Sequence, residues 1–343
     1  MKVDGALTTV HLPEVPQHAR DIQALGYDGL FTFEGRSDPF LPLALAAEHT
    51  SRVDLMTAIA LAFVRSPMAL AYTAHDLQVQ SSGRFILGLG AQIRTHVEKR
   101  YGAAYEHPLR RMHELVRALR AIWASWEGGP RLDFRGEFYR HTLSTPIFEP
   151  DPSPWGPPRI FLAAVQPRMT EAAGEVADGL IVHPLNSRRF IAERLLPAIE
   201  RGRAKVEKTR DGFEVAVQVL VVTGASDEEI ASNATPIRQQ LAFYGSTPAY
   251  RPVLETHGWG DLQTALHALS KQGRWIEMGD LITDEMLDTF AIRGVPEELP
   301  GKLAARYGDL ADRLSLVSYA GLERSDRDRW KSMLAAVRTT GRA

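Results

Sequence analysis

Short runs of apolar and β-branched residues alternate along this chain with longer segments in which apolar residues recur at helical spacing. The short runs, which we predict to be strands, are Lys2–Leu7, Gly29–Phe33, Val53–Ala60, Phe85–Leu89, Ile160–Ala164, Gly179–Val182, Val215–Val222 and Arg313–Ser318. This alternation is typical of βαβ units and a parallel sheet. Eight parallel strands close into a barrel without exposed sheet edges. We therefore predict an α/β fold, a (β/α)8 TIM barrel with insertions.

Residues that start or stop helices bound several of the helical segments. A helix over Val15–Leu25 is expected to end at Gly26, and the helix after the third strand to begin at Pro67. Further helices are expected at Leu41–His49 and Leu109–Trp126, a hairpin at Arg131–His141 and an irregular, proline-rich loop at Thr145–Pro158. The residues from about 226 to 290 are predicted to be mostly helical, so we expect a helical insertion within a single domain spanning residues 1–343.

Composition limits which binding partners and which cellular compartment we expect for this protein. The 343 residues are 44% hydrophobic and 24% charged, an ordinary balance for a globular protein. A formal net charge of −2 gives no reason to expect nucleic acid or an anionic membrane as partner. The sequence contains no cysteine, no long apolar span and no apolar core near its first residues that would serve as a secretion signal. We therefore expect a cytoplasmic protein.

Several familiar catalytic motifs are incomplete. Gly88-Leu89-Gly90 resembles the start of a dinucleotide-binding turn, but Ile93 stands where that turn needs a small residue. His113-Glu114 begins like a zinc-protease helix, but Arg117 occupies the position of the second histidine. The chain contains neither a phosphate-binding P-loop motif nor a G-x-S-x-G nucleophile elbow. No metal site is predicted, and an open doubly wound sheet is less well supported than the barrel.

In an α/β barrel, the chemistry lies at the carboxyl ends of the strands. In this chain those positions are mostly small and neutral, and the more reactive groups among them include Glu34, Gln92 and His183. Such a surface suits a flat, largely preformed cofactor pocket better than a hydrolase centre. A carboxylate or an imidazole at the edge of this pocket is a candidate for handling protons.

At these positions the sequence resembles the luciferase-like monooxygenase superfamily, and within it the coenzyme F420-dependent oxidoreductases. The segments that carry the resemblance occur in the family's order along nearly the whole chain. They are Asp38–Thr50, Thr57–Gln78, Ser82–Gly102, Asp133–Thr142, Ala163–Pro184 and Tyr244–Gly260. The resemblance implies a bacterial luciferase-like barrel and a deazaflavin or flavin cofactor.

The resemblance also implies a set of site residues. It places a non-prolyl cis peptide at Ala58–Ile59, pressed against the back of the cofactor ring. The implied cofactor-binding residues are Glu34, Thr57, Ala58, Ile59, Gly90, Ala91, Gln92, Val165, Gln166, Pro167 and Arg168. Glu34, Gln92 and His183 are the candidates for catalysis. The chain departs from sugar-phosphate dehydrogenase relatives at Gly35 and Ile93, which replace a histidine and a glutamate, and Gln166 replaces a glycine at the expected phosphate contact.

These implications lead to a function and two rivals. We expect an F420-dependent oxidoreductase that transfers hydride to or from a small organic substrate, in a homodimer or higher homo-oligomer. One rival is an FMN-dependent two-component monooxygenase of the same superfamily. The other is a barrel that binds flavin or deazaflavin without turnover. Titrating the protein with both cofactors separates the first two.

Overall fold

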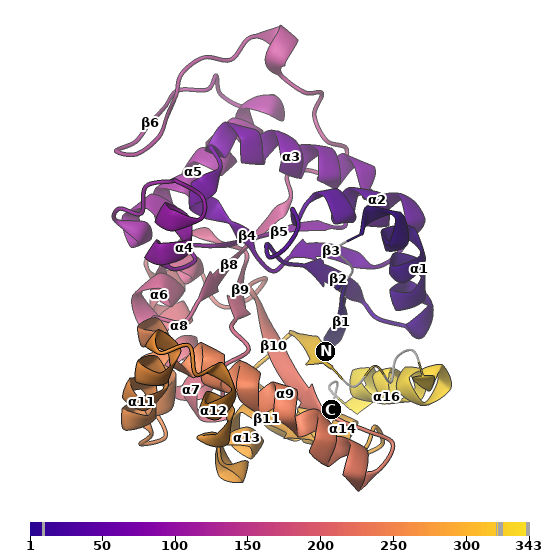
Figure 1. Ribbon diagram of the computed structural model, residues 1–343. Helices are drawn as coiled ribbons and strands as arrows, with labels where there is room; N and C mark the ends of the chain where they lie inside the picture. Colours follow the sequence, from indigo (N-terminus) through magenta and orange to yellow (C-terminus); the bar gives the residue numbers. More distant parts are fainter. Residues whose placement is uncertain (9–10, 320, 322–324, 341–343) are drawn as a thin grey trace.

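The predicted strands are apolar on both faces, and they pair in parallel around a closed barrel. The computed structural model describes residues 1–8, 11–319, 321 and 325–340 and shows the barrel surrounded by helices (Figure 1). The strands pair in the order β1, β2, β3, β5, β8, β9, β10 and β12, and the pairing of β12 with β1 closes the ring. The predicted (β/α)8 TIM barrel is confirmed.

Most strand boundaries follow the apolar runs to within one or two residues. The strands are β1 Lys2–Ala6, β2 Gly29–Thr32, β3 Asp54–Thr57, β4 Ala60–Leu61, β5 Phe85–Gly90, β6 Phe134–Arg135, β7 Arg140–His141, β8 Arg159–Ala164, β9 Gly179–Val182, β10 Glu214–Val222, β11 Ala291–Arg293 and β12 Arg313–Ser318. Strands β6 and β7 form the predicted hairpin, separate from the barrel. Strand β11 was not predicted; it pairs with the end of β10.

The helices cover the outside of the barrel. They are α1 Val15–Leu25, α2 Leu41–His49, α3 Pro67–Gln80, α4 Arg94–Lys99, α5 Pro108–Trp126, α6 Pro167–Val176, α7 Arg188–Phe190, α8 Leu196–Ala204, α9 Asp227–Gly245, α10 Arg251–Glu255, α11 Gly260–Lys271, α12 Trp275–Asp280, α13 Asp284–Phe290, α14 Leu299–Tyr307 and α16 Arg327–Thr340. Gly26 ends α1 in the left-handed conformation, and Pro67 begins α3 behind the Ser66 cap, as predicted. Helices α9 to α13 occupy the stretch expected to be helical and gather along one side of the barrel (Figure 1).

The third predicted strand, Val53–Ala60, is wrong as a continuous element. It divides into β3 and β4. Met56 lies opposite Ile86 of β5 and Ala60 lies opposite Leu89, so the chain from Met56 to Ala60 has one residue more than the facing stretch of β5. This extra residue makes a bulge. The Thr57 hydroxyl bridges the gap: it donates to the Gly88 carbonyl at 2.8 Å and accepts from the Gly88 N–H at 2.9 Å. Gly88 has no room for a side chain, since a Cβ there would lie 1.7 Å from the Thr57 carbonyl oxygen.

The barrel interior is filled in layers. Its middle holds a compact apolar cluster of Phe31, Met56, Ala58, Ile86, Phe161, Ile181 and Ala216. A much larger apolar core lies between the outer faces of the strands and the helices. The central cluster therefore separates the two ends of the barrel.

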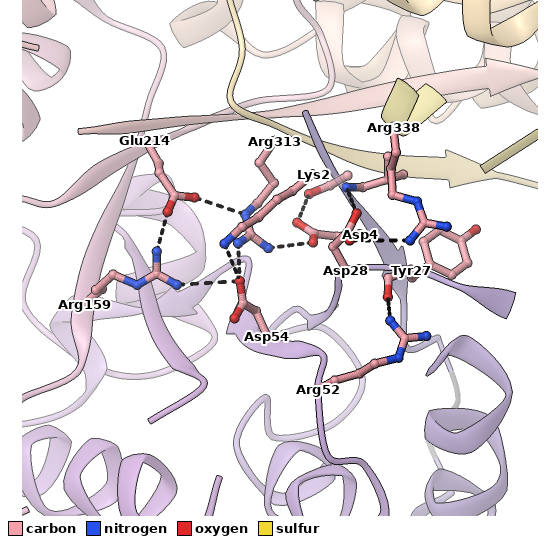
Figure 2. A network of polar contacts seen from close by, with 12 residues as sticks. Lys2, Asp4, Tyr27, Asp28, Arg52, Asp54, Arg159, Glu214, Arg313 and Arg338 are labelled. Atoms are coloured by element: carbon pink, nitrogen blue, oxygen red, sulfur yellow. Dashed lines mark hydrogen bonds and ion pairs between the residues drawn. The ribbon is translucent and has the colours of Figure 1, made fainter. Parts of the chain in front are cut away.

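A charged cluster fills the end of the barrel where the strands begin (Figure 2). The Arg313 side chain is fully buried and donates to Asp4 at 2.6 Å, to Asp54, and to Glu214 at 3.4 Å. Arg159 and Lys2 add further positive charge at the rim of this cluster. Burial raises the pKa of Asp4 to about 6 against the opposing effect of the Arg313 guanidinium. Asp4 therefore depends on Arg313 to remain ionised at neutral pH.

We expect the substitution Arg313→Met to lower the free energy of unfolding by roughly 3–5 kcal/mol, because it leaves buried carboxylates without a partner. Lys2→Met removes a cation from the same cluster, but the Lys2 side chain is 45% exposed, so we expect a loss below about 1 kcal/mol. Urea unfolding of both variants measures the difference. The double variant Arg313→Met, Asp4→Asn should recover part of the lost free energy of unfolding. Equal losses for Arg313→Met and Lys2→Met would contradict the conclusion that Arg313 compensates the buried carboxylates.

Candidate active site at the carboxyl ends of the strands

The bulge between β3 and β4 lies at the opposite end of the barrel from the charged cluster. The Ala58–Ile59 peptide bond is cis, as the family resemblance implied. Three hydrogen bonds hold this segment: the Ala58 N–H donates to the Thr32 carbonyl at 2.6 Å, the Glu34 N–H donates to the Ile59 carbonyl at 2.9 Å, and the Gln218 side chain donates to the Ala58 carbonyl at 3.4 Å. The bulge is thus fixed from β2 and from β10.

Small residues surround the bulge on the inner face of the barrel. Gly90 lies directly against Ile59, because a Cβ at Gly90 would be 2.0 Å from the Ile59 Cδ1 atom. Ala163 and Gln218 are half-buried, whereas the residues of the central apolar cluster beneath them are buried. Short, neutral side chains above a closed apolar floor form a surface that suits a flat ring.

The structure brings Glu34 to this end of the barrel but commits its carboxylate to other protein groups. Glu34 accepts from the Leu61 N–H and from the Arg65 guanidinium, both at 2.7 Å, and its side chain is only 5% exposed. Arg65 also pairs with Asp38 at 3.0 Å. This geometry gives Glu34 a role in anchoring β4 and Arg65, and it provides no free carboxyl for acid–base chemistry.

The segment after β5 places Gln92 at the surface of the site. Its side-chain oxygen accepts from the Ile93 N–H at 3.0 Å, and its carbonyl accepts from the Tyr105 hydroxyl at 3.1 Å. Gln92 has a positive φ of 56°, which turns the chain out of the strand after the half-buried Ala91. The side-chain NH2 of Gln92 has no hydrogen-bond partner within the described residues, so it is available to donate.

The segment after β8 is the predicted phosphate-binding corner. The Gln166 side chain donates to the Ala249 carbonyl at 2.6 Å and so ties the barrel to the helical insertion. Pro167 begins α6, and Val165 is half-buried beside it. Arg168 points elsewhere: it lines a cleft of about 610 Å³ on the outer surface between α5 and α6, together with residues such as His113 and Glu175. Thr57 is fully buried, and its hydroxyl is used in the bulge.

His183 lies at the end of β9 among aromatic rings. Tyr250 stacks on its imidazole with ring centroids 4.3 Å apart, and Tyr244 meets it edge-on at 4.5 Å. The His183 Nδ1 atom accepts from the Leu185 N–H at 3.1 Å, so the neutral ring carries its proton on Nε2. Burial lowers the pKa of His183 to about 3. At neutral pH this residue is therefore an uncharged hydrogen-bond donor, which differs from the proton shuttle expected from the sequence.

A buried asparagine fixes the loop that carries His183. The Asn186 side-chain amide donates to the His183 carbonyl at 2.8 Å and to the Gln218 carbonyl at 2.9 Å. Its oxygen accepts from the Tyr307 hydroxyl at 3.3 Å. Sequence reasoning did not identify Asn186 or Gln218, because neither forms part of a motif. An inward position in the period-two pattern of β10 was the one available indication for Gln218.

Two kinds of feature are absent from the described residues. They contain no cluster of three or more histidine, aspartate or glutamate side chains arranged to hold a metal ion. None of their helices combines the length and the apolar character needed to cross a membrane.

We expect His183 to remain neutral well below pH 6.5, because its surroundings disfavour the imidazolium. The ring nitrogen shifts of His183, followed by NMR from pH 8 to pH 4.5, should keep the pattern of a neutral ring protonated on Nε2. A His183 midpoint near 6.5 would contradict the burial argument.

Comparison with known proteins agrees with this architecture. The family of luciferase-like monooxygenases matches residues 2–313. An uncharacterized protein of Mycobacterium tuberculosis is 52% identical over 314 residues, which cover 92% of each chain. The 5,10-methylenetetrahydromethanopterin reductase of Archaeoglobus fulgidus is 28% identical over 285 residues, covering 82% of this chain and 78% of its own.

The solved structures include one that matches almost end to end. The coenzyme F420-dependent tetrahydromethanopterin reductase of Methanopyrus kandleri superposes with a TM-score of 0.79 at 18% identity, covering 98% of both chains. Because the family match extends over most of the sequence and the fold agrees with it, the chain belongs to the luciferase-like monooxygenase family.

Proposed function

We propose that this protein is an F420-dependent oxidoreductase that transfers hydride between the deazaflavin and a small organic substrate. The observation that carries the proposal is the neutral, small-residue surface around Ala58, Gly90 and Ala163. Relatives support the choice of cofactor, since the matched Methanopyrus kandleri reductase is F420-dependent. When bound, F420 supplies a ring carbon that carries hydride.

The residues present fit such a ring. Ala58 and Ile59 would support its face, and the backbone of Gly90 and Ala91 would approach its edge. The free NH2 group of Gln92 would donate to a ring carbonyl. Beyond the ring, Val165 and Gln166 would flank the tail, although the Gln166 side chain is engaged with Ala249. We assign no cofactor contact to Arg168, because it lines the outer cleft.

His183 is the residue best placed to act on a substrate. The neutral imidazole presents Nε2–H, which has no partner within the described residues. A fixed donor of this kind holds a carbonyl or hydroxyl oxygen and stabilises negative charge that develops on it. Tyr244 and Tyr250 exclude water from one side of the His183 imidazole, which strengthens a hydrogen bond from its Nε2–H to a substrate oxygen.

An FMN-dependent monooxygenase remains the rival, because the family that matches the chain takes its name from that chemistry. The polar groups around the bulge do not distinguish a flavin from a deazaflavin ring. Fluorescence titration of the purified protein with each cofactor separates the two. Tight FMN binding without F420 binding would reject our proposal.

The inner face of the barrel offers a direct test of the cofactor position. Ala163→Leu adds three carbons above the apolar floor, so we expect the Kd for F420 to rise at least about tenfold, a loss typical of overpacking. Ala335→Leu makes the same change on the exposed side of α16 and should leave the Kd unchanged. Both variants should keep the far-UV circular dichroism of the wild type. An unchanged Kd for Ala163→Leu would place the ring elsewhere.

The role of His183 is tested by removing its donor. We expect His183→Phe to lower kcat by roughly 10²-fold or more, the usual cost of losing a donor at a developing oxyanion. His183→Gln retains an N–H donor and should recover part of this activity. Because His183 is already neutral near pH 6.5, the dependence of the rate on pH around that value should be the same in the wild type and in both variants. Glu34→Gln should lower kcat much less than His183→Phe does. A larger loss in Glu34→Gln than in His183→Phe would assign the chemistry to Glu34.

A further inference from the structure

A cleft of about 610 Å³ lies on the outer surface of the molecule, where α5, α6 and the β6–β7 hairpin meet. The residues that form the surface proposed for the cofactor, Ala58, Gly90 and Ala163, do not line it. Sites for small organic molecules usually enclose about 300–1,000 Å³, so this cleft is large enough to hold one. The charges on its walls indicate which kind of molecule it fits.

One wall of the cleft, the hairpin, is held in place by a carboxylate of α5. The Glu114 side chain accepts hydrogen bonds from the backbone N–H groups of Glu137, Phe138 and Tyr139 at 2.9, 2.8 and 2.7 Å. Gly136 lies directly against this carboxylate, because a Cβ at Gly136 would be 2.0 Å from the Glu114 Oε1 atom. The negative charge of Glu114 is therefore compensated by the hairpin backbone, and the wall is formed before any ligand binds.

The other carboxylates that line the cleft each have a basic partner on its walls. The pairs are Asp133 with Arg135 at 2.8 Å, Glu175 with His113 at 2.8 Å and Glu171 with Lys205 at 2.6 Å. These contacts occupy the acidic groups of the cleft.

Two arginines on neighbouring helices remain without a partner. Arg117 of α5 and Arg168 of α6 both line the cleft, and within the described part of the chain neither forms a hydrogen bond or an ion pair. A guanidinium group binds the oxygens of a phosphate or a carboxylate through two parallel N–H donors. A phosphate monoester carries about 1.5–2 negative charges near neutral pH and offers three acceptor oxygens. Two unpaired guanidinium groups therefore match a phosphate monoester better than a single carboxylate.

The remaining lining of the cleft is apolar. Leu109 and Phe134 are half-buried on the α5 and hairpin sides, and Ala172 of α6 is buried. A ligand with an apolar or aromatic group attached to its phosphate would cover these side chains and remove their surface from water. The cleft thus combines a cationic part with an apolar part.

We propose that this cleft is a second ligand site, which binds a phosphate monoester with its phosphate between Arg117 and Arg168 and its organic group against Leu109 and Phe134. The site lies outside the barrel, so it does not depend on which cofactor the barrel binds. Arg168 belongs to the first turn of α6, close after Gln166, whose side chain holds the helical insertion at Ala249. A phosphate bound to Arg168 therefore contacts the helix that starts at the rim of the candidate active site.

Calorimetric titration of the purified protein with phenyl phosphate, inorganic phosphate and benzoate tests the site. The ionic strength is kept constant, because salt screens exposed charges. We expect phenyl phosphate to bind most tightly, since it has both the dianion and the apolar group. Arg117→Gln and Arg168→Gln should each raise its Kd at least about tenfold, the cost of losing a charged hydrogen-bond donor. Arg117→Lys and Arg168→Lys keep the charge without the paired donors and should give intermediate values.

A matched control is Arg194→Gln. Arg194 is also exposed and also lacks a partner within the described residues, but it does not line the cleft, so this variant should keep the wild-type Kd. The proposal would be overturned by equal losses in Arg194→Gln and in the cleft variants, by an unchanged Kd in both cleft variants, or by no measurable binding of phenyl phosphate. Tighter binding of benzoate than of phenyl phosphate would also overturn it.

A competition experiment separates the cleft from the cofactor surface. Phenyl phosphate is titrated into the protein in the presence of excess F420, and its Kd should equal the value measured without F420. Competition between the two would place the phosphate in the cofactor site and overturn the proposal of a second site.

Discussion

The hydrogen bonds between the Thr57 hydroxyl and the Gly88 backbone are the contact on which the rest of the site depends. Between Met56 and Ala60 the chain has one residue more than the facing stretch of β5, so the ordinary ladder cannot continue there. The hydroxyl replaces the missing backbone pairing on both sides of Gly88. The barrel thus stays closed while Ala58 and Ile59 are free to form the inner surface of the site.

The two ends of the barrel hold opposite kinds of chemistry. Arg313 and its carboxylates fill the end where the strands begin and are held by close pairing, with Arg313 and Asp4 fully buried. The end where the strands finish is lined by alanine, glycine, neutral imidazole and phenol groups. The central apolar cluster between them keeps the charged network away from the site. A neutral site of this kind would favour the proposed hydride transfer, because it leaves the strength of each fixed hydrogen bond unscreened.

The helical insertion contributes to the site as directly as the barrel does. Tyr244 and Tyr250 come from the insertion and enclose His183, and the Gln166 side chain joins the barrel to the insertion at Ala249. His183 owes its neutral state to this enclosure. The barrel therefore sets the position of the proposed cofactor, and the insertion determines what reaches it.

The sequence alone determined the elements and their order, because an apolar run or a stop residue such as Gly26 acts locally. The start of α3 at Pro67, the hairpin near Arg135 and the last strand at Arg313–Ser318 could all be predicted in this way. The cis bond at Ala58–Ile59 was implied by resemblance and is present. The tertiary structure decided which groups each of these side chains contacts. Glu34 is bound to Arg65, Arg168 faces an outer cleft, and Asn186 supports His183, because residues far apart in the chain meet there. The ionisation of His183 also depends on rings more than sixty residues away, which no local pattern encodes.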